Sequence, residues 1–162
     1  MIKRLAIAFC LLTAIAATGL AQQPISASKS DSMSASTTTQ DKKSLYDRLG
    51  GYNAVAAVVD DFIGRLVADK RFTKFFVGHS EDSLKKIRQH IVDQFCAAAG
   101  GPCLYTGRDM KTSHKGLGIT SDDWDAAAKH LVESLDKFNV PKAEKDDLLA
   151  FVTSLRKDIV EK

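Results

Sequence analysis

One histidine, His114, lies in a short glycine-bounded segment, 105–120, in which apolar residues flank it. Met110 stands four residues before it and Leu117 three residues after it, so the three side chains share one face if this turn is helical. The imidazole then points inward among apolar groups, where a ring nitrogen can bind a metal such as haem iron. A buried neutral histidine bonded to a carbonyl has the same pattern, and periodicity alone does not separate the two.

Three further histidines occur, and one of them is a second candidate ligand. His90 follows Ile87 by three residues and directly precedes Ile91, at the edge of an apolar helix stripe. It either reaches the metal that His114 would bind or lies at the solvent edge, and both interpretations stay open. His79 is expected in a loop and His130 on a solvated or hydrogen-bonded helix surface. No His, Cys and Asp set has the spacing of a zinc site.

The segments that must position these histidines carry apolar residues at helical spacing, which predicts an all-α domain. They run over about residues 55–66, 82–99, 120–138 and 141–159. Gly100-Gly101-Pro102 ends the second segment, because glycine frees the backbone and proline lacks a donor. Thr120 and Asp123 form a capping pair for the third segment, and Pro141 suits the first turn of the fourth. No repeat, Walker loop or dinucleotide-binding glycine pattern occurs.

The chain begins with the features of a secretory signal peptide. Lys3-Arg4 precedes an apolar run from Leu5 to Ala17, and small residues follow. We predict cleavage after Ala21, a signal peptide at 1–21, and export to the periplasm; retention as a membrane anchor is the alternative. The run is shorter than the about 20 residues of a membrane span, so no stable span is expected after cleavage.

The remainder divides into a linker and one domain. Residues 22–43 are rich in Ser, Thr, Gln and Ala, with almost no large apolar residue, which predicts a disordered linker. Residues 44–162 carry enough apolar material for one core. Removing the signal segment lowers the formal charge from +3 to +1, because Lys3 and Arg4 leave with it. The remaining basic residues are scattered among acidic ones, so no nucleic-acid partner is expected.

Several motifs together closely resemble the group I truncated haemoglobins. They are Leu45–Gly51, Phe75-Phe76, Gly100-Gly101, and the segment from Tyr105-Thr106-Gly107 to Ile119-Thr120. The resemblance covers about residues 44–159 and implies a truncated globin, a two-over-two helical sandwich around haem b (iron protoporphyrin IX), with His114 as the proximal iron ligand. The cofactor-binding residues that it implies are Phe62, Ile63, Phe76, Ile87, His90, Ile91, Tyr105, Met110 and His114, with His90 as the candidate distal iron ligand.

The same resemblance implies a protein that binds diatomic gases (O₂, NO or CO), for oxygen transport or for nitric oxide detoxification with an electron-donating reductase. Nitric oxide dioxygenase and peroxidase-like activities are the candidate enzyme reactions. A six-coordinate haem protein for electron transfer, redox or gas sensing is the alternative. Many group I members place a Tyr and a Gln as donors to the oxygen ligand, but the matching residues here are Ile63 and Ile91. An unmade hydrogen bond costs about 1–3 kcal/mol, so tight oxygen storage is not expected.

Cys96 and Cys103 lie seven residues apart across the Gly100-Gly101-Pro102 turn. In an oxidising compartment they can form a disulfide, if the turn brings their Cα atoms within about 4.4–6.8 Å. The alternative is a buried thiol at Cys96 and a loop thiol at Cys103. A Cys-x-x-Cys-His motif is missing, so c-type haem attachment is not expected.

Overall fold

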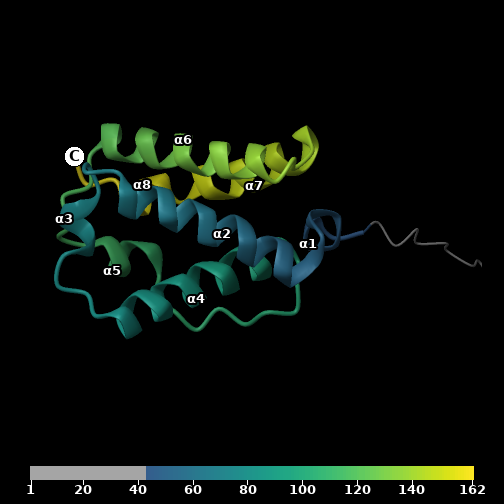
Figure 1. Cartoon of the computed structure of the whole chain (residues 1–162), viewed down its shortest axis with the longest axis horizontal. Helices are drawn as coiled ribbons and strands as arrows, with labels where there is room; N and C mark the ends of the chain where they lie inside the picture. The colour runs from purple at the N-terminus through teal and green to yellow at the C-terminus, as the bar shows by residue number, and fades with distance from the viewer. Residues whose placement is uncertain (1–42) are drawn as a thin grey trace, which may run out of the picture. The chain divides into compact units, whose positions relative to one another are not determined.

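The computed structural model describes residues 43–162, and this part of the chain contains helices and loops without a strand. The helices are α1 (Leu45–Leu49), α2 (Gly51–Ala68), α3 (Thr73–Phe76), α4 (Glu81–Ala98), α5 (Met110–His114), α6 (Ser121–Lys137), α7 (Lys142–Ser154) and α8 (Arg156–Ile159) (Figure 1). The all-α prediction is confirmed. The predicted signal peptide at 1–21 and residues 22–42 of the predicted linker lie outside the described residues. Over 43–162, every helix is too short or too polar to cross a bilayer.

Helix α2 runs between α4 and α6 and contacts both, which makes these three helices the frame of the domain (Figure 1). Their apolar stripes face one another, as the helical spacing predicts. Burying one such side chain contributes roughly 1.5–3 kcal/mol, so this packing is the main source of stability. The buried cluster consists of Val55, Ala56, Val58, Val59, Val92, Phe95, Leu131, Leu135 and Leu148.

Hydroxyl side chains cap the N-termini of α4 and α6, the frame helices that precede and follow the candidate histidine segment in the chain. At α4, the Ser80 hydroxyl accepts from the backbone N–H of Ser83 at 3.2 Å. At α6, the Thr120 hydroxyl accepts from Asp123 N–H at 3.1 Å, and the Asp123 carboxylate accepts from Thr120 N–H at 3.2 Å. The predicted capping pair is therefore a complete capping box. The expected stop after α4 is also confirmed, with Gly100 at φ +80°.

A loop without regular structure joins α4 to α5, and a disulfide fixes its first half. Cys96 and Cys103 form a disulfide, with their Cα atoms 5.8 Å apart. The other interpretation, two free thiols, is wrong. Gly101 lies in very close contact with its neighbours. A Cβ atom there would lie 2.5 Å from the Tyr46 ring and 2.7 Å from the Cys96 sulfur, so no side chain fits.

The fourth predicted helix, 141–159, is two helices in the structure. The break lies at Leu155, whose N–H donates to Val152 C=O three residues back at 3.0 Å. The Ser154 hydroxyl donates to the Phe151 carbonyl at 2.6 Å, which offers the backbone a partner outside the helix ladder. The break directs α8 onto α5, and the two short helices are in contact.

Candidate functional site

Helix α5 carries His114 at its last position and is only five residues long. Its start is held by Asp109, whose carboxylate accepts from the Thr112 backbone N–H at 2.7 Å and from the Thr112 hydroxyl at 2.7 Å. These bonds lower the pKa of Asp109 below its ordinary value, so the cap is charged at neutral pH. A short helix has little stability of its own, so this cap supports the residue at the other end.

The ring of His114 is oriented by its own helix. Its Nδ1 lies 2.8 Å from the carbonyl oxygen of Met110, one turn earlier. A carbonyl only accepts, so Nδ1 is the nitrogen that carries the proton. Nε2 of the neutral ring therefore keeps its lone pair. This is the tautomer of a metal-ligating histidine, whose second nitrogen is typically bonded to a carbonyl or carboxylate. Met110 and His114 share one face, as the spacing predicts, but α5 ends at His114, so the prediction is wrong for Leu117, which lies beyond the helix and is 42% exposed.

Helix α4 is tethered to α2 by an ion pair that sequence reasoning missed. Arg88 donates to Asp60 through Nε at 2.7 Å and through Nη2 at 2.9 Å. This bonding lowers the pKa of Asp60 and raises that of Arg88. Arg88 on α4 thus points toward Asp60 on α2.

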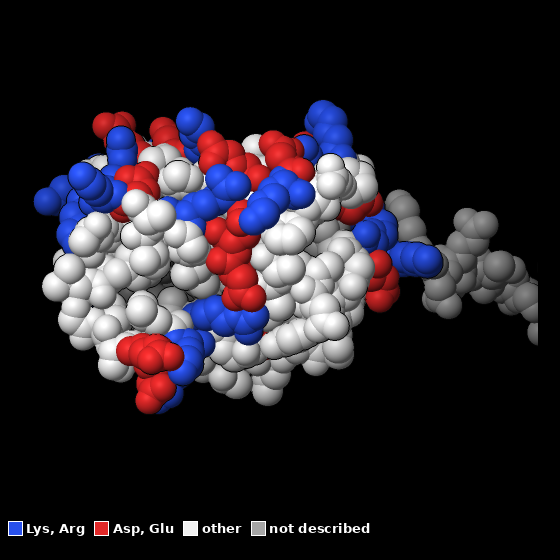
Figure 2. Space-filling model, viewed as in Figure 1, with Lys and Arg blue, Asp and Glu red and all other residues white. Residues whose placement is uncertain are grey.

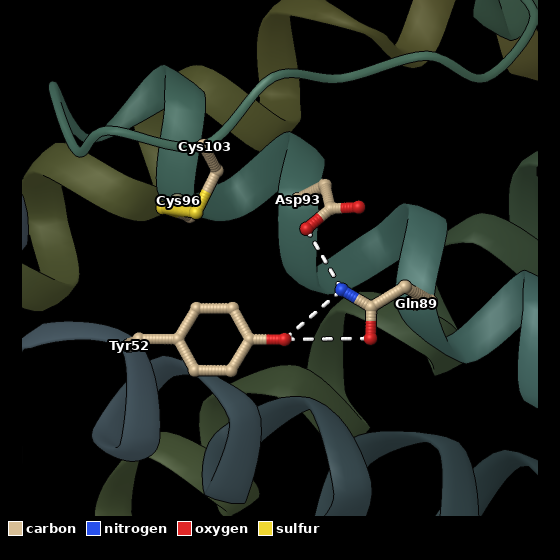
Figure 3. The surroundings of a disulfide bond; sticks show 5 residues. All are labelled: Tyr52, Gln89, Asp93, Cys96 and Cys103. Carbon is tan, nitrogen blue, oxygen red and sulfur yellow. Dashed lines mark hydrogen bonds between the residues drawn. A yellow bond between two sulfur atoms is a disulfide. The ribbon is translucent and has the colours of Figure 1, made fainter.

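A second tether, also missed from the sequence, joins the two helices beside the disulfide (Figure 3). Gln89 donates from its amide nitrogen to the Tyr52 hydroxyl at 3.0 Å and to the Asp93 carboxylate at 2.8 Å. The same helix carries Cys96, one turn beyond Asp93. Together the tethers and the disulfide fix the rotation of α4 about its axis, and with it the direction of His90.

His90 is turned toward the protein interior. Its Nδ1 is buried and has no hydrogen-bond partner among the described residues. The ring meets Tyr105 edge to face, with centroids 6.1 Å apart. Tyr105 is itself fixed, because its hydroxyl donates to the Arg108 carbonyl at 2.5 Å and a Cβ at Gly107 would lie 2.4 Å from that hydroxyl. Burial raises the pKa of Tyr105, which keeps this donor protonated.

The apolar predicted site residues outside α5 lie on α2, α3 and α4. Phe62, Ile63 and Ile91 are half-buried and pack against the core cluster. Phe76 of α3 and Ile87 of α4 are also half-buried but lie outside that cluster. In the view of Figure 2, the surface around α5 and α4 is mainly uncharged and contains a recess, with charged side chains along its rim.

The other two histidines follow their expectations. His79 is exposed in the loop before α4. His130 is half-buried on α6, and its Nε2 lies 3.0 Å from the Asp69 carboxylate. Among residues 43–162, no group of three or more His, Cys, Asp or Glu side chains has the arrangement of a metal site. An apolar cavity of about 150 Å³ lies in the core between α1, α2, α4, α6 and α7, and none of the candidate site residues lines it.

Comparison with known proteins decides the family. Residues 44–161 match the family of bacterial-like globins. The group 1 truncated hemoglobin GlbN of Mycolicibacterium paratuberculosis is 38% identical over 116 residues, which cover 72% of this chain and 83% of that protein. The chain belongs to the group 1 truncated haemoglobins. The GlbN protein of Nostoc sp. (strain MUN 8820) is 33% identical over 118 residues, 73% of this chain and 98% of the relative.

Solved structures place this truncated haemoglobin in the two-over-two fold. The 2/2 hemoglobin of Synechococcus sp. PCC 7002 in the cyanomet state has a TM-score of 0.67 at 33% identity, covering 74% of this chain and 100% of that chain. The truncated hemoglobin of Tetrahymena pyriformis in the Fe(III) form has a TM-score of 0.68 at 28% identity, with the same coverage. The predictions of family, fold and haem cofactor are confirmed, and the protein is a haem-binding globin that binds diatomic gases.

The residues of this truncated haemoglobin fit a haem. In the neutral ring of His114 the Nδ1 proton is bonded to the Met110 carbonyl, so the lone pair on Nε2 is available to a metal. The buried Nδ1 of His90 is a polar atom without a hydrogen-bond partner among the described residues, as is the Nδ1 of His130. Such an atom is costly unless something completes its bonding, and a group bound beside His90 can do so. Half-buried apolar side chains, among them Ile63 and Ile91, are of the uncharged kind that a porphyrin needs around it.

Proposed function

We propose that His114 Nε2 is the proximal iron ligand, with haem b held between α5 and the frame. The observation that carries this proposal is the bond in which Nδ1–H of His114 donates to the Met110 carbonyl, because it holds the proton of the neutral ring on Nδ1 and leaves Nε2 as the ligand atom. Phe62, Phe76 and Tyr105 would enclose the ring at its sides. When bound, haem supplies an iron that coordinates a diatomic gas and exchanges one electron.

We further propose that the gas pocket favours NO and CO over O₂. Ile63 and Ile91 stand where many relatives have hydrogen-bond donors, and neither side chain can donate. An O₂ ligand carries partial negative charge and loses about 1–3 kcal/mol without a donor, whereas NO and CO lose little. Oxygen is therefore released quickly, which argues against storage.

His90 is the residue that we propose to control the sixth coordination position. Its inward direction, its contact with Tyr105 and its unpartnered nitrogen support this role over the solvent-edge alternative. When His90 occupies the position, an external gas must displace it before binding. This favours the second candidate function, electron transfer or redox chemistry at a six-coordinate haem.

Nitric oxide detoxification belongs to the same proposal. One NO, one O₂ and one electron combine to give nitrate, so the reaction needs a reductase that supplies the electron. We propose this turnover in an exported, periplasmic protein. The Cys96–Cys103 disulfide supports export, because disulfides persist mainly in oxidising compartments.

The ligand role of His114 is tested by the absorption spectrum of residues 22–162 with added haem. The wild type should show a Soret band, and His114→Ala should lose most of it. His79→Ala is the matched control, since His79 is an exposed histidine outside the site. An unchanged spectrum of His114→Ala would refute the proposal.

The role of His90 is tested by the ferrous spectrum under argon. Sharp, split α and β bands in the wild type should give way to one broad visible band in His90→Ala. A broad band in the wild type would mean that His90 stays off the iron, and the gas-binding function alone would remain.

The missing donor is tested by restoring it. Ile63→Tyr should slow O₂ release by roughly 5-fold to 150-fold, the range that a hydrogen bond of about 1–3 kcal/mol provides. CO release should hardly change. Ile63→Phe is the control, because it adds the ring without the hydroxyl. Equal O₂ release from both variants would show that Ile63 does not face the ligand.

A further inference from the structure

The carboxylate of Glu161 binds the turn that directly follows α5. Gly116 N–H donates to Oε1 at 2.5 Å, and Gly118 N–H donates to Oε2 at 2.7 Å. Both glycines have positive φ, +82° and +65°, a conformation that other residues rarely adopt. The turn therefore presents two backbone donors to one side chain that lies more than forty residues further along the chain.

Backbone bonds hold Glu161 in register with this turn. Its own N–H donates to the Ile119 carbonyl at 2.9 Å, and Ser121 N–H donates to the Lys162 carbonyl at 3.0 Å. These bonds flank the two carboxylate bonds. The side chain thus reaches the turn from a segment whose position is already set, which reduces the entropy lost in binding it.

The turn is also bonded to His114. Leu117 N–H donates to the His114 carbonyl at 3.2 Å, between the two glycines that Glu161 binds. Helix α5 has one cap, at its start, and five residues are too few for a stable isolated helix. The end that carries His114 is therefore held by this turn and by the contact of α5 with α8.

We propose that Glu161 is a positioning residue for the proximal ligand: by binding Gly116 and Gly118 it fixes the end of α5 and slows haem release. The inference rests on the proposed role of His114 as iron ligand. Glu161 is charged at neutral pH, since the two backbone N–H groups lower the pKa of its carboxyl. Its hydrogen bonds act through the turn, because the ring of His114 is bonded to Met110 instead.

The test compares Glu161→Ala, Glu161→Gln and Asp158→Asn in the haem-loaded protein, with haem-free myoglobin in excess as the acceptor of released haem. Asp158 is the matched control, since its side chain has no hydrogen bond or ion pair within 43–162. Glu161→Ala should release haem roughly tenfold faster, as expected when an outer partner of a metal ligand is lost. Glu161→Gln should be intermediate, because its amide has a single acceptor oxygen, and Asp158→Asn should match the wild type.

Two readouts separate positioning from a purely structural role. The iron–histidine stretching band of the ferrous protein should shift in both Glu161 variants, and the amides of Gly116 and Gly118 should exchange faster in the haem-free protein. Wild-type release and an unshifted band in both variants would overturn the inference while leaving the proposed function intact. Haem retention by His114→Ala equal to the wild type would instead refute the proposed function, and the inference with it.

Discussion

In the frame of α2, α4 and α6, Val59, Val92 and Leu135 are fully buried, whereas α5 contains no buried residue. The frame is stabilised by apolar packing between long helices. The segment with His114 is held by individual directional bonds. They are the Asp109 cap, the ring bond of His114, the Cys96–Cys103 disulfide before the segment and the Glu161 carboxylate on the turn after it. The residues that stabilise the fold and those that position the proposed ligand His114 therefore lie in different parts of this globin.

This difference has a physical reason. Apolar packing is non-directional, so it stabilises the frame without specifying one atom to within a few tenths of an ångström. Hydrogen bonds and covalent bonds have defined geometry, so they suit a residue whose ring must meet a metal. Changes in the frame should then act on the free energy of unfolding, and changes around α5 on haem binding.

The largest expected effect comes from Leu131, which is 1% exposed on α6. Leu131→Ala should lower the free energy of unfolding by about 2–5 kcal/mol, because the cavity cannot collapse fully. Urea unfolding of the haem-free protein, followed by circular dichroism, measures it. The control is Leu117→Ala beside α5, which is 42% exposed and should cost within about 0.5 kcal/mol. Similar losses in both would contradict the division of the molecule into two regions.

The disulfide should rank next. Opening a loop with a sequence separation of 7 removes roughly 2–3 kcal/mol by the chain-entropy argument. Cys103→Ser is the variant of choice, because Cys96 is fully buried and is better left in place. In the Cys103→Ser variant, α2, α4 and α6 should stay helical, while hydrogen exchange should accelerate in the loop that carries Tyr105. The wild type treated with dithiothreitol should show the same faster exchange in this loop as Cys103→Ser. The exchange of Cys103→Ser itself should not change when the reductant is added. Unchanged exchange in the loop would show that other contacts hold Tyr105.

The frame could be predicted from the sequence because its signals are local. Apolar residues three and four apart define α2, α4 and α6, and the Thr120 and Asp123 pair marks the start of α6. The spacing of Met110 and His114 likewise predicts their shared face. The ligand role of His114 rests on the family resemblance, since spacing alone allows a histidine bonded to a carbonyl, and the structure contains that bond.

Other features could not be predicted because they depend on partners far along the chain. Arg88 meets Asp60 twenty-eight residues away, and no local pattern selects that pair. Glu161 meets Gly116 across forty-five residues. At the break near Leu155, the Ser154 hydroxyl donates to the Phe151 carbonyl and competes with the helix hydrogen bonds. Helix propensity does not indicate whether a serine makes this bond. The ring of His90 packs against the ring of Tyr105, which lies in the loop that the disulfide fixes.

A third prediction concerns the polar part of the frame. Asp61 accepts from Arg65 at 2.7 Å and from Ser134 at 2.8 Å, and Lys137 also donates to it. The bond from Arg65 is the main cause that lowers the pKa of Asp61 far below its ordinary value. A carboxyl whose pKa is lower in the folded than in the unfolded state stabilises the fold above the unfolded pKa of about 4, and this stability is lost as the pH falls further.

Asp61→Asn should therefore cost about 1–3 kcal/mol of unfolding free energy at pH 7, and less as the pH falls below about 4. Denaturation curves at several pH values measure the difference. Asp125→Asn is the control, because the Asp125 side chain is 72% exposed and its closest cation is 4.0 Å away. A difference between wild type and Asp61→Asn that does not narrow in acid would mean that the charge of Asp61 does not stabilise the frame.

The smallest effect is expected where the two regions meet. Thr120 follows the turn that Glu161 binds and begins α6 with its capping box. Thr120→Ala should cost about 1 kcal/mol of unfolding free energy, the usual value for such a cap. Ser44→Ala, which removes the cap of the short helix α1, should cost less, since α1 contains no buried residue. Haem release should stay at the wild-type rate in both. If Thr120→Ala speeds haem release as much as Glu161→Ala does, the start of α6 positions His114 as well, and stability and ligand positioning are coupled at this residue.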